Sequence, residues 1–228
     1  MSDFHRRLAV AWLVSLGVGC TSAPVRYYTL SQAPDQTSPA SYTAPPVDVR
    51  VVHTPPQLNR AELMVRTGPA ELTLLENERW ASPVNDEIKD ALRLELRRRL
   101  SGMTGLRAGF SKLTLDIDVQ HLEAEFGRYA LIEASWSATL SAGDRPSNGT
   151  RVAICTFEDY ERIGTGYAGM VEGYQRGIAA LADAILAVLT SSASNTGSAS
   201  GTDSASGTDA PCQKPVEGSA GGSDPKDR

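Results

Sequence analysis

The sequence predicts a single-domain α/β sandwich, in which a mixed, mostly antiparallel sheet is covered by two main helices. Residues 113–119 alternate apolar and polar side chains with period two, as a half-buried strand does, and residues 130–140 return with a matching pattern. Residues 84–100 and 170–189 instead carry apolar side chains at helical spacing. These two periodicities, strand-like in the middle of the chain and helical on either side, define the class.

The first strands are short and are separated by turn residues. We expect strands at 26–31 and 47–52. Residues 62–66 and 71–75 flank a Thr-Gly-Pro-Ala turn, so they predict a small hairpin.

The first helix has the clearest boundaries. Ser82 is the expected N-cap, and Pro83 fits the first helical position, where its missing N–H has no cost. Gly102 follows the last turn, and the arginines at 97–99 complement the negative end of the helix dipole. We interpret these arginines as a solvated last turn; an anion or lipid-headgroup site is the alternative.

The long hairpin that follows carries the candidate binding residues. A two-residue turn at Gly127-Arg128 would place residues 113–119 opposite residues 142–136, apolar against apolar. Near the turn the parity of the apolar residues changes, which indicates a bulge or strong twist near His121. We therefore expect an apolar patch at the hairpin tip, away from the main core. Such a patch covers a helix or loop of the same domain more often than it binds a partner. Its members, the candidate partner-binding residues, are Leu122, Phe126, Tyr129 and Leu131.

A strand, a helix and a polar tail end the chain. Residues 151–162 predict a strand with a central place in the sheet, since it is apolar on both faces near its start. A helix is expected at 167–190, which closes a domain spanning 26–190. Residues 191–228 are rich in Ser, Gly and Asp and lack aromatic residues, so we predict a disordered tail.

The N-terminal residues 1–19 have the charged start, short apolar run and small-residue end of a secretory signal peptide. Cys20 follows directly and resembles the cysteine of a bacterial lipobox, whose thiol is acylated and becomes the first mature residue. Thr21, in place of Asp, favours the outer membrane under the sorting rule of such lipoproteins. Residues 20–25 would then form a lipidated tether. A signal peptide with an incidental cysteine is the alternative.

Two other cysteines remain. Cys155 lies in the apolar strand pattern and Cys212 in the tail. A bridge between them is compatible with an oxidising periplasm, but we expect a buried free thiol at Cys155. The cysteines and histidines show no metal-ligand spacing, so no metal is expected.

The sequence offers little support for an enzyme. Gly164, Gly166 and Gly169 spell a dinucleotide fingerprint, but no second strand follows the helix that they open, so no cofactor is expected. Asp116 and Asp118 fall on the polar face of their strand, where we expect them to be solvated. The net charge of −5 argues against a nucleic-acid partner.

Several segments, taken in order, resemble the ABC-type transport auxiliary lipoproteins, the PqiC-like family. They are Cys20, Tyr27-Tyr28-Thr29-Leu30, Trp80-Ala81-Ser82-Pro83, the strand at 113–119, Glu133-Ala134-Ser135-Trp136 and the helix at 167–190. The resemblance implies a non-enzymatic lipoprotein on the periplasmic face of the outer membrane. It implies partners too: an ABC permease and ATPase with an MCE-domain protein, which move lipids or other hydrophobic molecules between the membranes. A ring-shaped homo-oligomer is also suggested. A structural envelope lipoprotein and a stand-alone lipid carrier are the alternatives.

Overall fold

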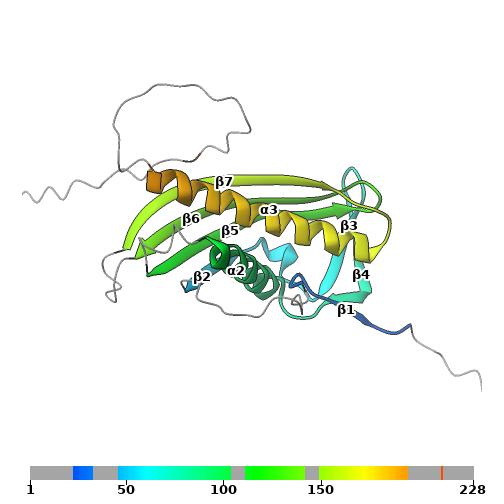
Figure 1. The fold of residues 1–228 in the computed structure, drawn as a ribbon. Coiled ribbons are helices and arrows are strands. Elements are labelled where there is room, and N and C mark those ends of the chain that lie inside the picture. The colour runs from blue at the N-terminus through cyan, green and yellow to red at the C-terminus, as the bar shows by residue number, and fades with distance from the viewer. Residues whose placement is uncertain (1–22, 33–45, 104–110, 142–148, 195–211, 213–228) are drawn as a thin grey trace, which may run out of the picture.

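The computed structural model describes residues 23–32, 46–103, 111–141, 149–194 and 212 of the 228-residue chain (Figure 1). The elements in order are β1 (Arg26–Tyr28), β2 (Val47–His53), the 3-10 turn η1 (Pro56–Leu58), β3 (Glu62–Gly68), β4 (Glu71–Trp80), α2 (Val84–Gly102), β5 (Lys112–Glu125), β6 (Tyr129–Ser141), β7 (Gly149–Arg162) and α3 (Tyr167–Ser194). The predicted α/β class with two main helices is confirmed. The second helix runs to Ser194, four residues further than expected, so the predicted tail begins inside α3.

The described strands divide into two sheets. The smaller has the order β1-β4-β3, and the larger has the order β2-β5-β6-β7. In each sheet the first strand pairs in parallel, β1 with β4 and β2 with β5, while the other pairs are antiparallel. β7 is therefore an edge strand and not a central one, and Ile154 stays 40 % exposed on it.

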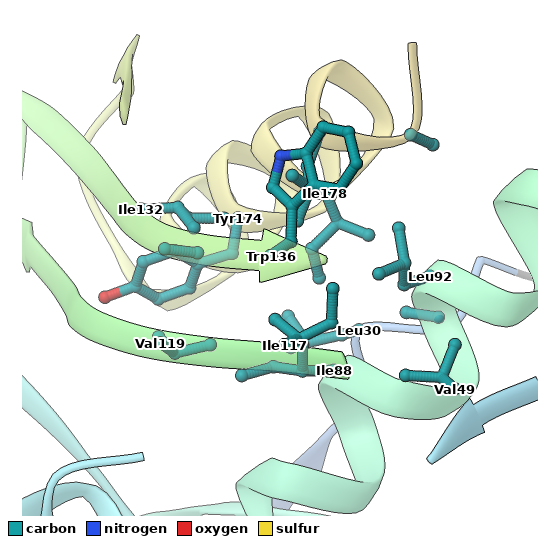
Figure 2. Packing of buried hydrophobic residues seen from close by; sticks show 14 of the residues in the cluster. Leu30, Val49, Ile88, Leu92, Ile117, Val119, Ile132, Trp136, Tyr174 and Ile178 are labelled. Atoms are coloured by element: carbon teal, nitrogen blue, oxygen red, sulfur yellow. The ribbon is translucent and has the colours of Figure 1, made fainter. Parts of the chain in front are cut away.

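The main core lies between the larger sheet and the two helices, which both cover one face of that sheet (Figures 1 and 2). Side chains of one parity on each strand point into this layer, as the pleat requires. In Figure 2, Ile117 of β5 and Trp136 of β6 meet Ile88 of α2 and Ile178 of α3. The opposite face of the larger sheet carries polar and half-buried side chains, and we call it the open face.

The hairpin of β5 and β6 turns through three residues, not two. Glu125 pairs with Tyr129, and Gly127 between them has φ +72°, a left-handed conformation that favours glycine. The prediction of a two-residue turn is therefore wrong by one position.

The predicted bulge near His121 is confirmed: the register shifts between Val119 and His121. The loop and the bulge each move the register by one residue, so Leu113 pairs with Leu140 and not with residue 142. Because a shift of two residues keeps the pleat parity, apolar residues still face apolar ones across the pair.

Ser82 does not cap α2. Pro83 occupies the N-cap position without a side-chain bond, and both the backbone N–H and the hydroxyl of Ser82 donate to Glu87 Oε1, at 3.0 and 2.7 Å. Glu87 Oε2 also accepts from Thr29 Oγ1 at 2.7 Å and from the backbone N–H of Leu30 at 2.9 Å. One buried carboxylate thus joins the end of β1 to the start of α2.

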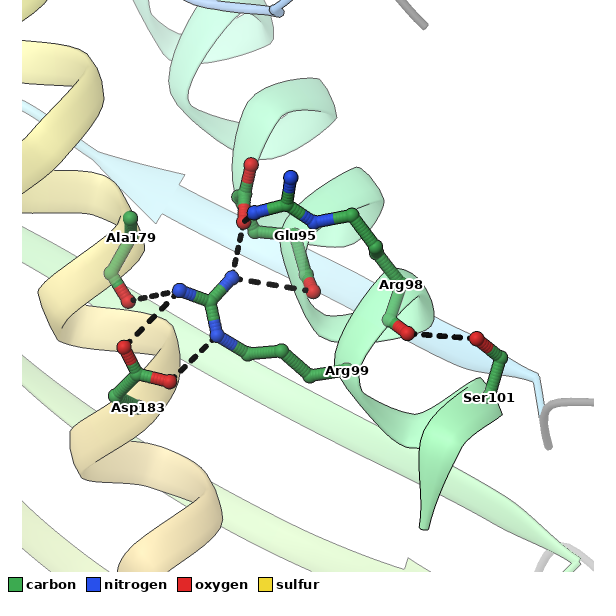
Figure 3. Close-up of polar contacts among 6 residues, drawn as sticks. All are labelled: Glu95, Arg98, Arg99, Ser101, Ala179 and Asp183. Atoms are coloured by element: carbon green, nitrogen blue, oxygen red, sulfur yellow. Dashed lines mark hydrogen bonds and ion pairs between the residues drawn. The ribbon is translucent and has the colours of Figure 1, made fainter. Parts of the chain in front are cut away.

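The last turn of α2 is not simply solvated, because Arg99 connects the two helices (Figure 3). Its guanidinium donates to both carboxylate oxygens of Asp183, at 2.5 and 3.0 Å, and to the backbone oxygen of Ala179 at 3.1 Å. It also pairs with Glu95 on its own helix, which Arg98 contacts at 2.6 Å. The hydrogen bonds from Arg99 lower the pKa of Asp183 below its ordinary value.

Cys155 is bonded to Cys212 in a disulfide, with the two Cα atoms 4.2 Å apart. The expectation of a free thiol at Cys155 is therefore wrong. Cys155 is buried on β7, and its partner Cys212, which follows α3 in the sequence, is exposed. The bridge attaches Cys212 to the larger sheet.

Replacement of Cys212 by serine should lower the free energy of unfolding by roughly 2–4 kcal/mol, because the bridge closes a long loop in the unfolded chain. Urea unfolding of the mature chain, with and without reductant, measures this loss. Reductant should lower the wild type to the level of the variant and leave the variant unchanged. Equal stability of the oxidised wild type and Cys212→Ser would contradict the bridge.

Candidate interaction surfaces

The predicted lipidation residue, Cys20, lies outside the described residues. The described chain begins shortly after it, and β1 starts at Arg26.

The hairpin-tip residues do not form one patch. Leu122 is only 7 % exposed, belongs to the main core and pairs with Ile132. Phe126 packs against the same core and meets the ring of Tyr167 edge-on, with the centroids 5.2 Å apart. These two residues stabilise the domain interior, the commoner use of an apolar hairpin tip.

The other two candidates lie on the open face. Because the turn has three residues and not two, Tyr129 and Leu131 pair with Glu125 and Glu123 and not with the apolar residues beside them. The alternation of residues in the sequence could not by itself assign these side chains to a face of the sheet. The assignment depends on which residue is the extra one in the bulge.

Tyr129 and Leu131 join Tyr160 of β7 in a group that we call the tyrosine cluster, together with Glu123 and Arg66. The rings of Tyr129 and Tyr160 stack with centroids 4.4 Å apart and planes 24° apart, and Leu131 pairs with Tyr160 across the strands. Tyr160 remains 58 % exposed while Tyr129 beneath it is 8 % exposed. The cluster therefore presents a large aromatic surface on a buried, fixed base.

Hydrogen bonds hold that base in place. The hydroxyl of Tyr129 donates to Glu123 Oε1 at 2.6 Å, and the guanidinium of Arg66, from β3, donates to both oxygens of the same carboxylate. The hydrogen bonds from Arg66 hold the pKa of Glu123 below its ordinary value. Burial of the phenol, with its bond to Glu123, raises the pKa of Tyr129 to about 12. Glu123 thus links the two sheets, because its carboxylate accepts hydrogen bonds from Arg66 of the smaller sheet and from Tyr129 of the larger one.

A hollow of about 380 Å³ lies further along the open face. Asp116 and Asp118 lie there on the polar face as predicted, and Asp116 pairs with Arg50 at 3.1 Å. Among the described residues, no group of histidines, cysteines and carboxylates could hold a metal ion. The residues that line the hollow are His53, Asp116, Ile117, Asp118, Ser135, Trp136, Ser137 and Ile154.

The glycine motif forms the tight turn from β7 into α3. Gly166 has φ +92°, and the backbone oxygen of Gly164 accepts from the N–H of Gly127 at 3.0 Å. Gly169 lies directly over Gly164, where an added Cβ would come within 3.4 Å of its backbone oxygen. Since β7 pairs antiparallel with β6, these glycines open no parallel βαβ unit.

Solved structures share this fold. A protein described as uncharacterized aligns with a TM-score of 0.53 and 18 % identity, over 72 % of this chain and 97 % of its own. Protein XCC0632 from Xanthomonas campestris aligns with a TM-score of 0.50 and 15 % identity, over 75 % of this chain and 99 % of its own. At these identities the likeness concerns the fold alone. None of the curated proteins matches the sequence.

The fold and its surfaces define a two-sheet α/β domain with an open sheet face. The family model of the ABC-type transport auxiliary lipoprotein component matches residues 28–186, and the chain belongs to this family. The resemblance drawn from the ordered sequence segments is thereby confirmed. The family places the protein among lipoproteins that assist ABC transport, anchored to a membrane on its periplasmic side. Within the described residues, no helix has the length and apolar character that crossing a membrane requires.

Proposed function

We propose that this protein is a non-enzymatic auxiliary lipoprotein of an ABC transport system that contains an MCE-domain protein. Acylated Cys20 anchors it to the periplasmic face of the outer membrane, and the system moves lipids or other hydrophobic molecules between the two membranes. The observation that carries this proposal is the family match over most of the folded domain. The cysteine directly after a signal-like segment supports the anchor.

The folded domain contributes a docking surface in this proposal, and the tyrosine cluster is the part of the open face best suited to the task. Tyrosine offers a large contact area with a polar tip, which makes it common among the residues that dominate interface energies. Here Tyr160 is exposed on a base that hydrogen bonds already hold, so little conformational entropy is lost when a partner binds. The partner in this proposal is the MCE-domain subunit.

The variants Leu131→Glu and Tyr160→Glu should lower capture of the MCE-domain subunit by roughly tenfold or more, because a charge would be buried at the centre of the contact. The measurement is affinity capture of the tagged protein from crosslinked envelopes, with quantitative mass spectrometry of the transport subunits. Ala187→Glu is the matched control, since it places the same charge at an exposed position of α3. Circular dichroism should be alike for all three variants.

The outcomes of this experiment test the docking surface and the transport role separately. Wild-type capture by both cluster variants would exclude the tyrosine cluster as the contact. Recovery of cell-wall or outer-membrane proteins without any transport subunit would contradict the transport role itself. A Cys20→Ala chain should be lost from the membrane fraction if acylation supplies the anchor.

A further inference from the structure

We propose that the β1 end of the domain lies on the membrane, with Val25 and Tyr27 in the headgroup region as a second contact beside the acyl chains. This inference rests on the acylation of Cys20 proposed above. It adds a defined orientation: one end of the domain faces lipid, and the other projects into the periplasm.

The exposure of these two residues is the first observation. Tyr27 is 65 % exposed and Val25 is 42 % exposed, and both are among the most exposed large hydrophobic residues of the described chain. Tyrosine concentrates at membrane interfaces because its ring is apolar and its hydroxyl stays hydrated. The side chain of Arg26, between them, is 60 % exposed, and its charge is paired with that of Glu78.

The second observation is the short distance along the chain from the anchor to this strand. An extended chain advances at most about 3.6 Å per residue, so Arg26 stays within roughly 20 Å of the acylated Cys20. The headgroup region itself occupies several ångströms on each side of the hydrocarbon core. The anchor therefore keeps the exposed side chains of β1 close to the lipid headgroups, which gives lipid a high effective concentration at this strand.

The third observation is that β1 is fixed to the domain, so the anchor orients the whole body. Tyr28 pairs in register with Trp80 of β4, and Arg26 Nε donates to both oxygens of Glu78 at 3.0 Å. The guanidinium carbon of Arg26 also lies 5.3 Å from the ring centre of Tyr167. Glu78 is 5 % exposed and paired, so its charge is not presented to an anionic surface.

The direction of α3 then determines what projects from the membrane. This helix begins beside β1 at Tyr167 and ends at the opposite end of the molecule, as Figure 1 shows. Its 28 residues span about 42 Å at 1.5 Å per residue. The end of α3 therefore lies furthest from the lipid.

Depth-dependent fluorescence quenching tests this orientation. A Tyr27→Trp chain, acylated at Cys20, is placed in phosphatidylethanolamine–phosphatidylglycerol vesicles that contain phospholipid brominated near the headgroup. Ile154→Trp is the matched control, because Ile154 is also exposed but lies far along β7 from this end. The two native tryptophans of the domain, Trp80 and Trp136, are buried and contribute a constant background.

The expected result is a loss of at least half of the added emission from Tyr27→Trp and an unchanged emission from Ile154→Trp. Flotation of the protein with the vesicles is measured in the same samples. If the protein floats and Tyr27→Trp is not quenched, the orientation is wrong while the anchor stands. If the protein does not float, the anchor fails and the orientation with it. Quenching of Ile154→Trp alone would show that another face meets the lipid.

Discussion

Replacement of Gly173 by alanine should lower the free energy of unfolding by roughly 1–3 kcal/mol, and replacement by leucine should prevent folding. A Cβ at this position would lie 2.3 Å from Ile163 Cγ2 and 2.9 Å from Ala130 Cβ, so α3 would have to move away from the sheet. Urea unfolding of the mature chain, followed by circular dichroism, measures the effect.

Gly102→Ala is the matched control for this prediction. Gly102 ends α2 and has no atom within 4 Å of an added Cβ, so alanine there should leave the stability unchanged or raise it by up to about 1 kcal/mol. A second substitution that shortens Ile163 to alanine should reduce the cost of Gly173→Ala, since it removes the closest atom. Gly173→Ala with wild-type stability would show that α3 does not approach the sheet this closely.

A row of glycines explains why this effect should be large. Gly169, Gly173 and Gly177 follow one another at a spacing of four, which places them on one side of α3. An added Cβ at Gly177 would come within 2.7 Å of Ile132 Cδ1. The helix thus meets β6 and β7 through its backbone, and the sheet supplies the side chains that fill the contact.

Glu87→Ala should be the other strongly destabilising change, at about 3 kcal/mol. The carboxylate is 5 % exposed and accepts four hydrogen bonds, from Thr29, Leu30 and twice from Ser82. Removal leaves the buried N–H of Leu30 without an acceptor, which costs about 1–3 kcal/mol, and the three part-buried donors of Thr29 and Ser82 add a smaller loss because water can reach them. Glu87→Gln keeps one acceptor oxygen and should lose roughly half as much.

Hydrogen exchange distinguishes this role from a general effect on α2. In Glu87→Ala the amide of Leu30 should exchange faster than the amides in the middle of the helix. Glu172→Ala, at an exposed position of α3, is the control and should stay within about 0.5 kcal/mol of the wild type. Uniform acceleration throughout α2, with Leu30 no more affected than the rest, would argue against a specific link to β1.

Local patterns in the sequence predicted the elements well. The period-two alternation of residues 113–119 located β5, and the helical spacing of residues 170–189 located most of α3, because both reflect one buried face. The same patterns could not divide the strands into two sheets. β1 and β2 are too short to show which partner they pair with, and each joins a different sheet through a parallel pair.

Contacts between distant residues account for the errors. Arg99 appeared as part of a charged helix end, yet its partner Asp183 lies 84 residues further along the chain. The bridge from Cys155 to Cys212 joins residues that lie 57 apart in the sequence, a pairing that residue spacing does not reveal. Of the four candidate partner-binding residues, Tyr129 and Leu131 lie on the open face and Leu122 and Phe126 pack against the main core, and their binding of a partner stays a prediction. Tyr160, which stacks on Tyr129 and pairs with Leu131, lies in a separate strand, and no local pattern in the sequence relates it to the hairpin.

The parallel pairing of β1 has a consequence for the order of folding. Arg26 meets Glu78 across 52 residues of sequence, and Thr29 meets Glu87 across 58. Contacts of such separation form late, because the intervening loop must close first. The hairpin of β3 and β4 pairs residues that are close together in the sequence, so it can form earlier. We therefore expect β1 to be the last strand to dock, so a chain acylated at Cys20 as proposed would be held at the membrane before its body acquires a fixed direction.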